Sequence, residues 1–256
     1  MKNIMAGTLA DAWAMWKADR DLLTRLAGLL LFLPSFAILL LVPRMPPLVI
    51  DPNATEAAQR VVAEAVASWM MKYGGWPLLA SILVQFAALA LQLLYLRADR
   101  PDLGTALGRA MRLFPRYLPA MILVGVPLGA AQFSLLFFLP GLYLFGRMML
   151  TGPVLVVDPK PSIRRAVARS WALTHGHGLA AAGLAGLAVF GGGTLASLFL
   201  AVDRGLNAAQ LANPVALALV DAAAAAMMAA TMLALALFQV ALYRRLASGP
   251  VSNRGI

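Results

Sequence analysis

The chain has 256 residues, of which 61% are hydrophobic and only 12% are charged, and its mean hydropathy is +0.80. Soluble globular proteins are about half apolar and about a quarter charged, and a chain of this length could not hide so much apolar surface from water. The composition therefore excludes a soluble enzyme and a disordered chain, and it predicts a protein folded in lipid. The chain has no cysteine, which excludes disulfides and thiolate chemistry.

Six apolar segments are long enough to cross a bilayer, for which a helix needs about 20 residues. The predicted spans are residues 22–42, 76–96, 118–139, 140–157, 179–202 and 214–243. Pro140-Gly141 predicts the turn between the third and the fourth span, and the sixth span is long enough to tilt or to project from the bilayer. We therefore expect one all-α, polytopic membrane domain over residues 1–256, with six transmembrane helices.

The positive charge is distributed unevenly between the two sides of these spans. Sixteen of the 21 Lys and Arg residues fall on one side, in the N-terminal arm, the second and fourth connections and the C-terminal tail. The other side has Arg44, Arg60, Lys72 and Arg204, and Arg147 lies within a span. Because cytoplasmic loops carry the excess of Lys and Arg, both termini are predicted to be cytoplasmic. The net charge of +10 is therefore interpreted as a topology signal, and no nucleic-acid partner is expected.

A short amphipathic stretch precedes each odd-numbered span on the cytoplasmic side. The apolar faces of the three stretches are Leu9, Trp13 and Trp16; Leu103, Leu107, Met111 and Phe114; and Ile163, Val167 and Ser170/Trp171. A basic face opposite an aromatic or aliphatic face is typical of interfacial helices. Residues 106–113 and 166–173 also match in sequence, so we expect three repeats at 5–96, 103–157 and 161–246. Each repeat would be an interfacial helix followed by a hairpin of two spans.

The sequence pattern of the outer loop 51–73 predicts a further amphipathic helix. This helix could be a lid or only a connector, and the connector is the favoured interpretation. Asn53 is suited to cap this helix, with Glu56 three residues later. Val62, Val66, Trp69 and Tyr73 form one face.

Three polar side chains within the spans are predicted to cluster, because ionisable residues at membrane depth are costly. Arg147, Asp221 and Gln85 lie seven, seven and eight residues beyond Pro140, Pro214 and Pro77, respectively. If these prolines mark one plane, Arg147 and Asp221 form an intramembrane ion pair. Alternatively, residues 222–242 span alone and leave Asp221 at the outer interface. The pair could serve transport or only orient helices.

Small residues predict close helix packing in the last two spans. Gly178, Ala182 and Gly186 step by four, as do Ala222, Ala226, Ala230 and Ala234. The Gly191–Gly193 run predicts a packing kink or a break at a cavity.

The motifs that support catalysis are missing from the sequence. There is no HExxH, GxSxG or Walker lysine loop, and the only glutamates, Glu56 and Glu64, lie in the outer loop. His175 and His177 lack nearby carboxylate ligands, whereas a metal site needs three or four ligands. We therefore expect no catalytic residues, no metal and no cofactor.

Three segments carry a family resemblance. Residues 140–147 read PGLYLFGR, residues 152–157 read GPVLVV and residues 166–176 read AVARSWALTHG. They resemble the P-G-x-Y-L…R, P-x-V-V and A-x-x-R-S-W-x-L-T-x-G runs of the bacterial YciC-like membrane proteins and of the membrane domain of some glycerophosphodiester phosphodiesterases. His175 and His177 stand where the family has basic or amide residues. The resemblance is specific over residues 140–178 and implies a bacterial inner-membrane fold. It implies no activity, because the phosphodiesterase catalytic domain is absent from these residues.

Two functions are compatible with this pattern. The favoured one is non-enzymatic, namely handling or organising lipid, or anchoring a membrane or cytoplasmic partner protein. Anionic headgroups would bind a set of six arginines: Arg109, Arg112, Arg116, Arg164, Arg165 and Arg169. The alternative is a small-solute or ion transporter that uses Arg147, Asp221 and Gln85. A phosphodiesterase-like enzyme would require a soluble partner chain that supplies the chemistry.

Overall fold

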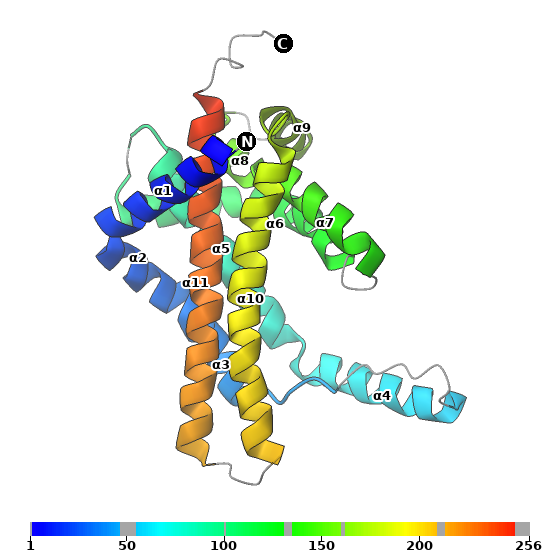
Figure 1. The fold of residues 1–256 in the computed structure, drawn as a ribbon. Coiled ribbons are helices and arrows are strands. Elements are labelled where there is room, and N and C mark those ends of the chain that lie inside the picture. Colours follow the sequence, from blue (N-terminus) through cyan, green and yellow to red (C-terminus); the bar gives the residue numbers. More distant parts are fainter. Residues whose placement is uncertain are drawn as a thin grey trace.

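A computed structural model describes residues 2–46, 55–99, 101–130, 135–159, 162–208 and 213–248, and their regular secondary structure is entirely helical. Six of the described helical segments are long and apolar enough to cross a membrane, which indicates a multi-pass membrane protein. The longest helices, α10 (Gly178–Ala208) and α11 (Pro214–Ala247), pack side by side (Figure 1). α1 begins and α11 ends at the same end of the bundle, which we call the basic end; the opposite end is called the far end.

The first predicted span is one continuous helical rod with a local irregularity. It comprises α2 (Arg20–Ala27), a π-helical turn η1 (Gly28–Phe32) and α3 (Leu33–Leu41). Pro34 lies in the first turn of α3, two residues after the π-helical turn. A proline has no N–H for the helical hydrogen bond and its ring crowds the preceding turn, so a wider turn at this point accommodates it. The chain returns along α5 (Gly75–Leu96).

The predicted boundary between the second amphipathic stretch and the third span is wrong. Both belong to a single helix, α6 (Leu103–Ala130), with three prolines inside it. The turn predicted at Pro140-Gly141 is also wrong, because Pro140 lies within α7 (Leu135–Met148) and the chain reverses between residues 130 and 135. Each proline removes only one backbone hydrogen bond, a loss that apolar helices in membranes tolerate.

The fourth predicted span is divided into two helices. α7 ends at Met148, and α8 (Thr151–Val157) follows with Pro153 in its first turn. Proline is well tolerated at this position because the first-turn N–H groups of a helix have no helical partner. Residues 151–156 are all buried, so α8 forms part of the core.

Three helical segments at the basic end bury pairs of small residues. These are α1 (Lys2–Ala18), the start of α6 and α9 (Ile163–Leu173). The buried pairs, each at i and i+4, are Thr8 and Ala12, Ala106 and Ala110, and Ala166 and Ser170. Most of the predicted apolar faces also pack against the core, through Leu9, Trp16, Leu103, Leu107, Phe114 and Ile163, which are half-buried. The exceptions are three large side chains, one from each segment. Trp13, Met111 and Trp171 instead expose 58%, 66% and 41% of their surface.

The outer-loop helix is present as α4 (Glu56–Tyr73), and it projects sideways from the far end (Figure 1). Its N-cap is Thr55, whose side chain accepts a hydrogen bond from the Ala58 N–H; Asn53 lies outside the described residues. The helix buries no residue, and the Trp69 indole donates to the Pro43 carbonyl at 2.7 Å. It packs against α5, as a connector would.

The small-residue prediction is confirmed for α10 and is wrong for α11. Gly178, Ala182 and Gly186 face α7, where an added Cβ on Gly146 would lie 2.5 Å from the Ala182 nitrogen. On α11 the predicted Ala226 and Ala230 are exposed, and other alanines such as Ala225 are buried instead. α10 continues without a break through Gly191–Gly193.

Candidate functional site

A groove at the basic end brings positive charge next to apolar surface. It has a volume of about 500 Å³ and lies between α8, α9 and the end of α11. Its lining residues are Val154, Val157, Asp158, Pro159, Arg165, Ala168, Arg169, Ala172 and Tyr243. The two arginines are exposed on α9, one turn apart, because the opposite face of α9 is held against the core by Ala166 and Ser170.

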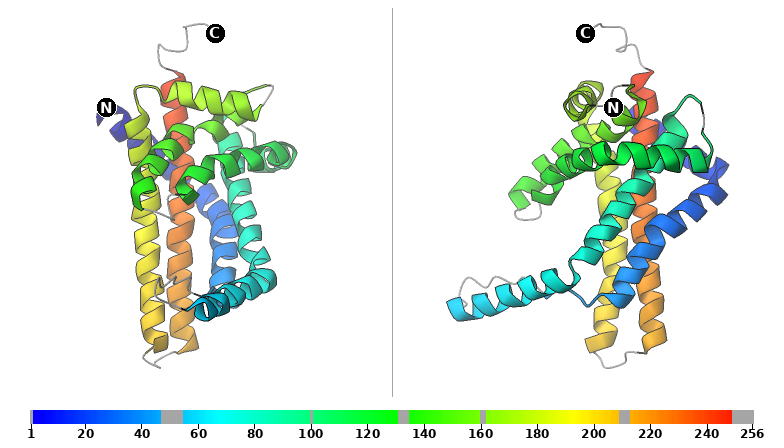
Figure 2. Two further views of the ribbon diagram at one scale, coloured as in Figure 1. Left: turned by 90° about the vertical axis from the view of Figure 1, so that its right-hand side faces the viewer. Right: turned by 180° about the vertical axis from the view of Figure 1, so that it is seen from behind.

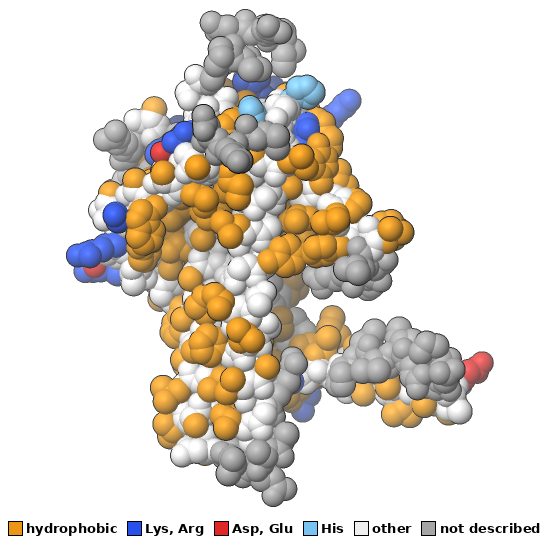
Figure 3. All heavy atoms as spheres, viewed as in Figure 1, with side chains coloured by type: hydrophobic (Ala, Val, Ile, Leu, Met, Phe, Trp, Pro, Cys, Tyr) orange, Lys and Arg blue, Asp and Glu red, His pale blue; other side chains and the backbone are white. Residues whose placement is uncertain are grey.

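The charges of this groove favour an anion. Two guanidinium groups, from Arg165 and Arg169, face one carboxylate, from Asp158. Arg164 is exposed on the same helix but does not line the groove. Lys and Arg side chains are visible around the basic end, while apolar side chains cover the flanks of the bundle (Figure 3).

The other three predicted headgroup ligands lie on α6. Arg112 and Arg116 are exposed, whereas Arg109 is engaged by Asp99 across a 2.6 Å ion pair. The structure therefore brings together only two of the six predicted arginines in a groove, and it assigns a local pairing role to Arg109.

The Asp99–Arg109 contact predicts an acid-sensitive attachment of the α5–α6 connection. The hydrogen bond from Arg109 holds the pKa of the Asp99 carboxyl below its ordinary value. A carboxyl whose pKa is lowered in the folded state contributes its full stabilisation at pH values above its pKa in the unfolded chain, which is about 3.9. This contribution is lost as the pH falls through the lower pKa of the folded state. We expect the thermal midpoint in detergent to decrease over this acidic range, and Asp99→Asn to reduce that decrease. An equally steep decrease in Asp99→Asn would contradict the assignment.

Arg147 is 5% exposed and lies under α9, near the end of α7. Its guanidinium donates to the Trp171 carbonyl at 2.8 Å and to the Tyr143 hydroxyl at 3.3 Å, and it stacks 4.3 Å from the centre of the Trp171 ring. Ser170 and Thr174 donate to the Arg147 carbonyl at 2.8 and 3.2 Å. An arginine near the C-terminus of a helix donates hydrogen bonds to its last carbonyl groups and interacts favourably with the helix dipole. Here the helix is α9, because Trp171 lies in its last turn. Arg147 thus fastens α9 to α7.

The predicted Arg147–Asp221 pair is wrong. Asp221 is buried near the other end of α11, where the charge that acts on it is Arg44, just beyond α3. Arg44 itself forms an ion pair with Asp203 of α10. The pairing failed because Pro140 and Pro214 do not mark one plane: Pro140 is inside α7 and Pro214 begins α11. This placement agrees with the alternative in which residues 222–242 span alone and Asp221 lies near one end of the span.

Gln85 lines a small cavity of about 100 Å³ that neither Arg147 nor Asp221 lines; with Tyr117 and Gln239 it forms the polar part of that lining. The Gln92 amide donates to the Gln239 carbonyl oxygen at 2.8 Å, in the buried core. Gln92 lies two helical turns beyond Gln85 on α5. Gln92 and Gln239 were not among the predicted residues, although amides within apolar spans are a recognisable signal for interhelical hydrogen bonds.

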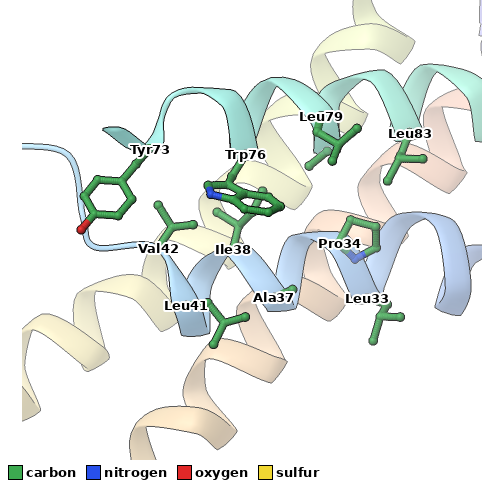
Figure 4. Close-up of a pocket in the computed structure, with 11 residues that line it drawn as sticks. Leu33, Pro34, Ala37, Ile38, Leu41, Val42, Tyr73, Trp76, Leu79 and Leu83 are labelled. Carbon is green, nitrogen blue, oxygen red and sulfur yellow. The ribbon is translucent and has the colours of Figure 1, made fainter. Parts of the chain in front are cut away.

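A second groove lies between α3 and α5, towards the far end (Figure 4). Its volume is about 450 Å³, and side chains such as Leu33, Ile38, Trp76 and Leu83 line it. Tyr73 lies at one end of the groove and contributes the only polar side-chain atom apart from the Trp76 indole N–H. This groove can accept an apolar chain but offers no group for acid–base or nucleophilic chemistry.

No family model, no curated protein and no solved structure matches this chain.

Proposed function

We propose that the protein resides in a bacterial inner membrane and binds anionic lipid at the cytoplasmic leaflet, where it handles or organises lipid or anchors a partner protein. The observation that carries this proposal is the groove in which Arg165 and Arg169 adjoin an apolar wall. A phosphate would accept hydrogen bonds from the guanidinium groups. The first carbons of the acyl chains would lie on Val154, Val157 and Ala172.

The proposed orientation of the protein in the membrane is inferred from the distribution of Lys and Arg. α9 and the end of α11, which carry Arg164, Arg165, Arg169, Arg244 and Arg245, lie at the basic end. Because Lys and Arg are enriched on the cytoplasmic side, we place the basic end and both termini in the cytoplasm. The bacterial inner membrane follows from the YciC-like resemblance. The motif residues Tyr143, Arg147, Ser170 and Thr174 meet in one cluster, which supports the resemblance.

A threefold repeat of an interfacial helix followed by a hairpin is part of this proposal. Residues 8–15 (TLADAWAM), 106–113 (ALGRAMRL) and 166–173 (AVARSWAL) align without gaps. The first and fifth aligned positions hold the buried pairs of small residues described above, and the sixth holds Trp13, Met111 and Trp171, which are exposed. Large apolar or aromatic side chains on the outer face of such a helix suit the headgroup layer.

The transporter alternative loses its main support because Arg147 and Asp221 are apart. The cavity beside Gln85 and Gln239, at about 100 Å³, is well below the 300–1,000 Å³ typical of ligand pockets. The far-end groove between α3 and α5 instead suits a lipid acyl chain, since its lining is almost wholly apolar.

The test compares lipid retention in nanodiscs of defined composition that contain equal amounts of anionic and zwitterionic phospholipid. We expect Arg165→Gln/Arg169→Gln to reduce the excess of anionic lipid by about 30-fold, because each of the two cations near the surface contributes on the order of 1 kcal/mol.

The matched control, Arg112→Gln/Arg116→Gln, removes the same charge from α6 and should have a smaller effect. Asp158→Asn should increase retention, since it removes the only carboxylate among the residues that line the groove. Equal losses in the two double variants would show that retention depends on the overall positive charge of the surface and not on the groove, and would contradict the proposal.

A further inference from the structure

The hairpin of α6 and α7 differs from the other two hairpins in how far it extends along the bundle. Along α7, Tyr143 and Arg147 lie against Gly178 of α10, and Gly146 lies against Ala182. Further along, Leu142 lies against Gly186, and the rings of Phe138 and Phe190 are 4.9 Å apart. α7 therefore runs beside only the first part of α10. Phe190 is 12 residues beyond Gly178, or about 18 Å at 1.5 Å per residue.

The far end of the bundle lies well beyond this point. Arg44, at the end of the first predicted span, pairs with Asp203 of α10 and acts on Asp221 of α11. Asp203 is 13 residues, or about 20 Å, beyond Phe190. The hydrocarbon core of a bilayer is about 30 Å thick. The first and third hairpins thus reach a charged layer at the far end, and the second hairpin ends about 20 Å before it.

The burial of α10 decreases beyond Phe190, the level at which α7 begins. From Gly178 to Ala188 most residues are buried, among them Ala181, Leu184 and Ala185, although Leu179 and Leu187 are exposed. Beyond Phe190 large apolar side chains are exposed: Leu195 at 46%, Leu198 at 58% and Val202 at 52%. The views in Figure 2 agree, because α6 lies crosswise near the basic end and α7 stops at mid-height, while α10 and α11 continue.

The sequence of the second hairpin is also distinct. Residues 118–146 contain no Lys, Arg, His, Asp or Glu. The connection after the first span carries Arg44, Glu56 and Lys72, and the end of α10 carries Asp203 and Arg204. A loop that emerges into water ordinarily carries such groups, whereas a chain that stays in hydrocarbon avoids them.

We propose that the α6–α7 hairpin is re-entrant: it enters the membrane from the basic end and turns back inside it without crossing. Four helical rods then cross, namely α2–η1–α3, α5, α10 and α11. The far half of α10, with Leu195, Leu198 and Val202, faces the acyl chains of the leaflet at the far end. These chains occupy the space between the hairpin and the far end. This inference goes beyond headgroup binding and does not depend on it.

The absence of native cysteine makes single-cysteine labelling a direct test. Ala130→Cys and Leu136→Cys flank the turn of the hairpin, and Leu136 is 79% exposed in the isolated chain. Arg164→Cys reports the basic end and Glu56→Cys reports the far end. A membrane-impermeant maleimide is applied to right-side-out and to inverted vesicles, and then to the same proteins in detergent.

We expect Arg164→Cys and Glu56→Cys to be labelled from opposite sides. Ala130→Cys and Leu136→Cys should be labelled from neither side, and should become fully reactive in detergent, which also shows that they have not become buried by misfolding. A spin label at Leu136→Cys should collide with dissolved oxygen far more than with a water-soluble nickel chelate. Labelling of Leu136→Cys from the Glu56 side would show a full crossing and overturn the proposal. Labelling from the Arg164 side would place the hairpin outside the membrane and overturn it as well.

Discussion

Gly192→Ala is expected to destabilise the protein by at least about 2 kcal/mol, because overpacking a tight contact typically costs about 1–3 kcal/mol or more. A Cβ built on Gly192 overlaps the side chain of Thr231 on α11. That side chain is also fixed by a 2.7 Å hydrogen bond from its hydroxyl to the Met227 carbonyl. The two longest helices would have to separate to accept the methyl group. Thermal unfolding in detergent measures the loss.

The neighbouring glycines provide the matched controls. A Cβ on Gly191 or on Gly193 meets no atom within 4 Å. Alanine at either position should be neutral or stabilising by about 0.4–1 kcal/mol, because it reduces the entropy of the unfolded chain. Gly192→Ala with Thr231→Ala should recover part of the loss. If all three alanine variants behave alike, the α10–α11 packing described here is wrong.

Arg147→Met is expected to lower stability by about 3 kcal/mol, since hydrogen bonds from a charged donor contribute about 1.5–3 kcal/mol each. The variant leaves the Trp171 carbonyl without its buried donor and removes the cation from the Trp171 ring. Arg147→Lys keeps the charge but cannot reach Tyr143 and Trp171 together, so it should recover little. Thermal unfolding, together with the protease sensitivity of α9, provides the measurement.

A double-mutant cycle separates this role from the ion pair that the sequence suggested. Arg147 and Asp221 share no partner among the described residues, so the losses in Arg147→Gln and Asp221→Asn should add. A double variant no worse than either single variant would restore the intramembrane pair and contradict the structure.

Hydropathy and charge located the helices of this fold because these signals are local. The spans 76–96 and 214–243 correspond to α5 and α11 within a few residues. The stepping of Gly178, Ala182 and Gly186 also identified a true packing face, because a period of four residues marks one side of a helix.

Depth and partner choice could not be derived in the same way. Pro140-Gly141 has the sequence of a turn, yet Pro140 lies inside α7. The depth of Arg147, which was counted from Pro140 as the start of a span, was therefore wrong. The bonds from Arg147 to Trp171 and from Gln92 to Gln239 join residues 24 and 147 positions apart, and no periodicity reports such pairs. α9 was recognised as amphipathic, but only the structure shows that Arg165 and Arg169 share a groove with Tyr243.

The proposed function requires that the protein binds anionic lipid at its basic end. Mass spectrometry of the protein extracted from native membranes into lipid-retaining nanodiscs measures this binding, with an unrelated multi-pass protein from the same membrane as the reference. We expect a stoichiometric anionic lipid on this protein, absent from the reference and lost in Arg165→Gln/Arg169→Gln. An identical lipid complement on the two proteins would contradict it.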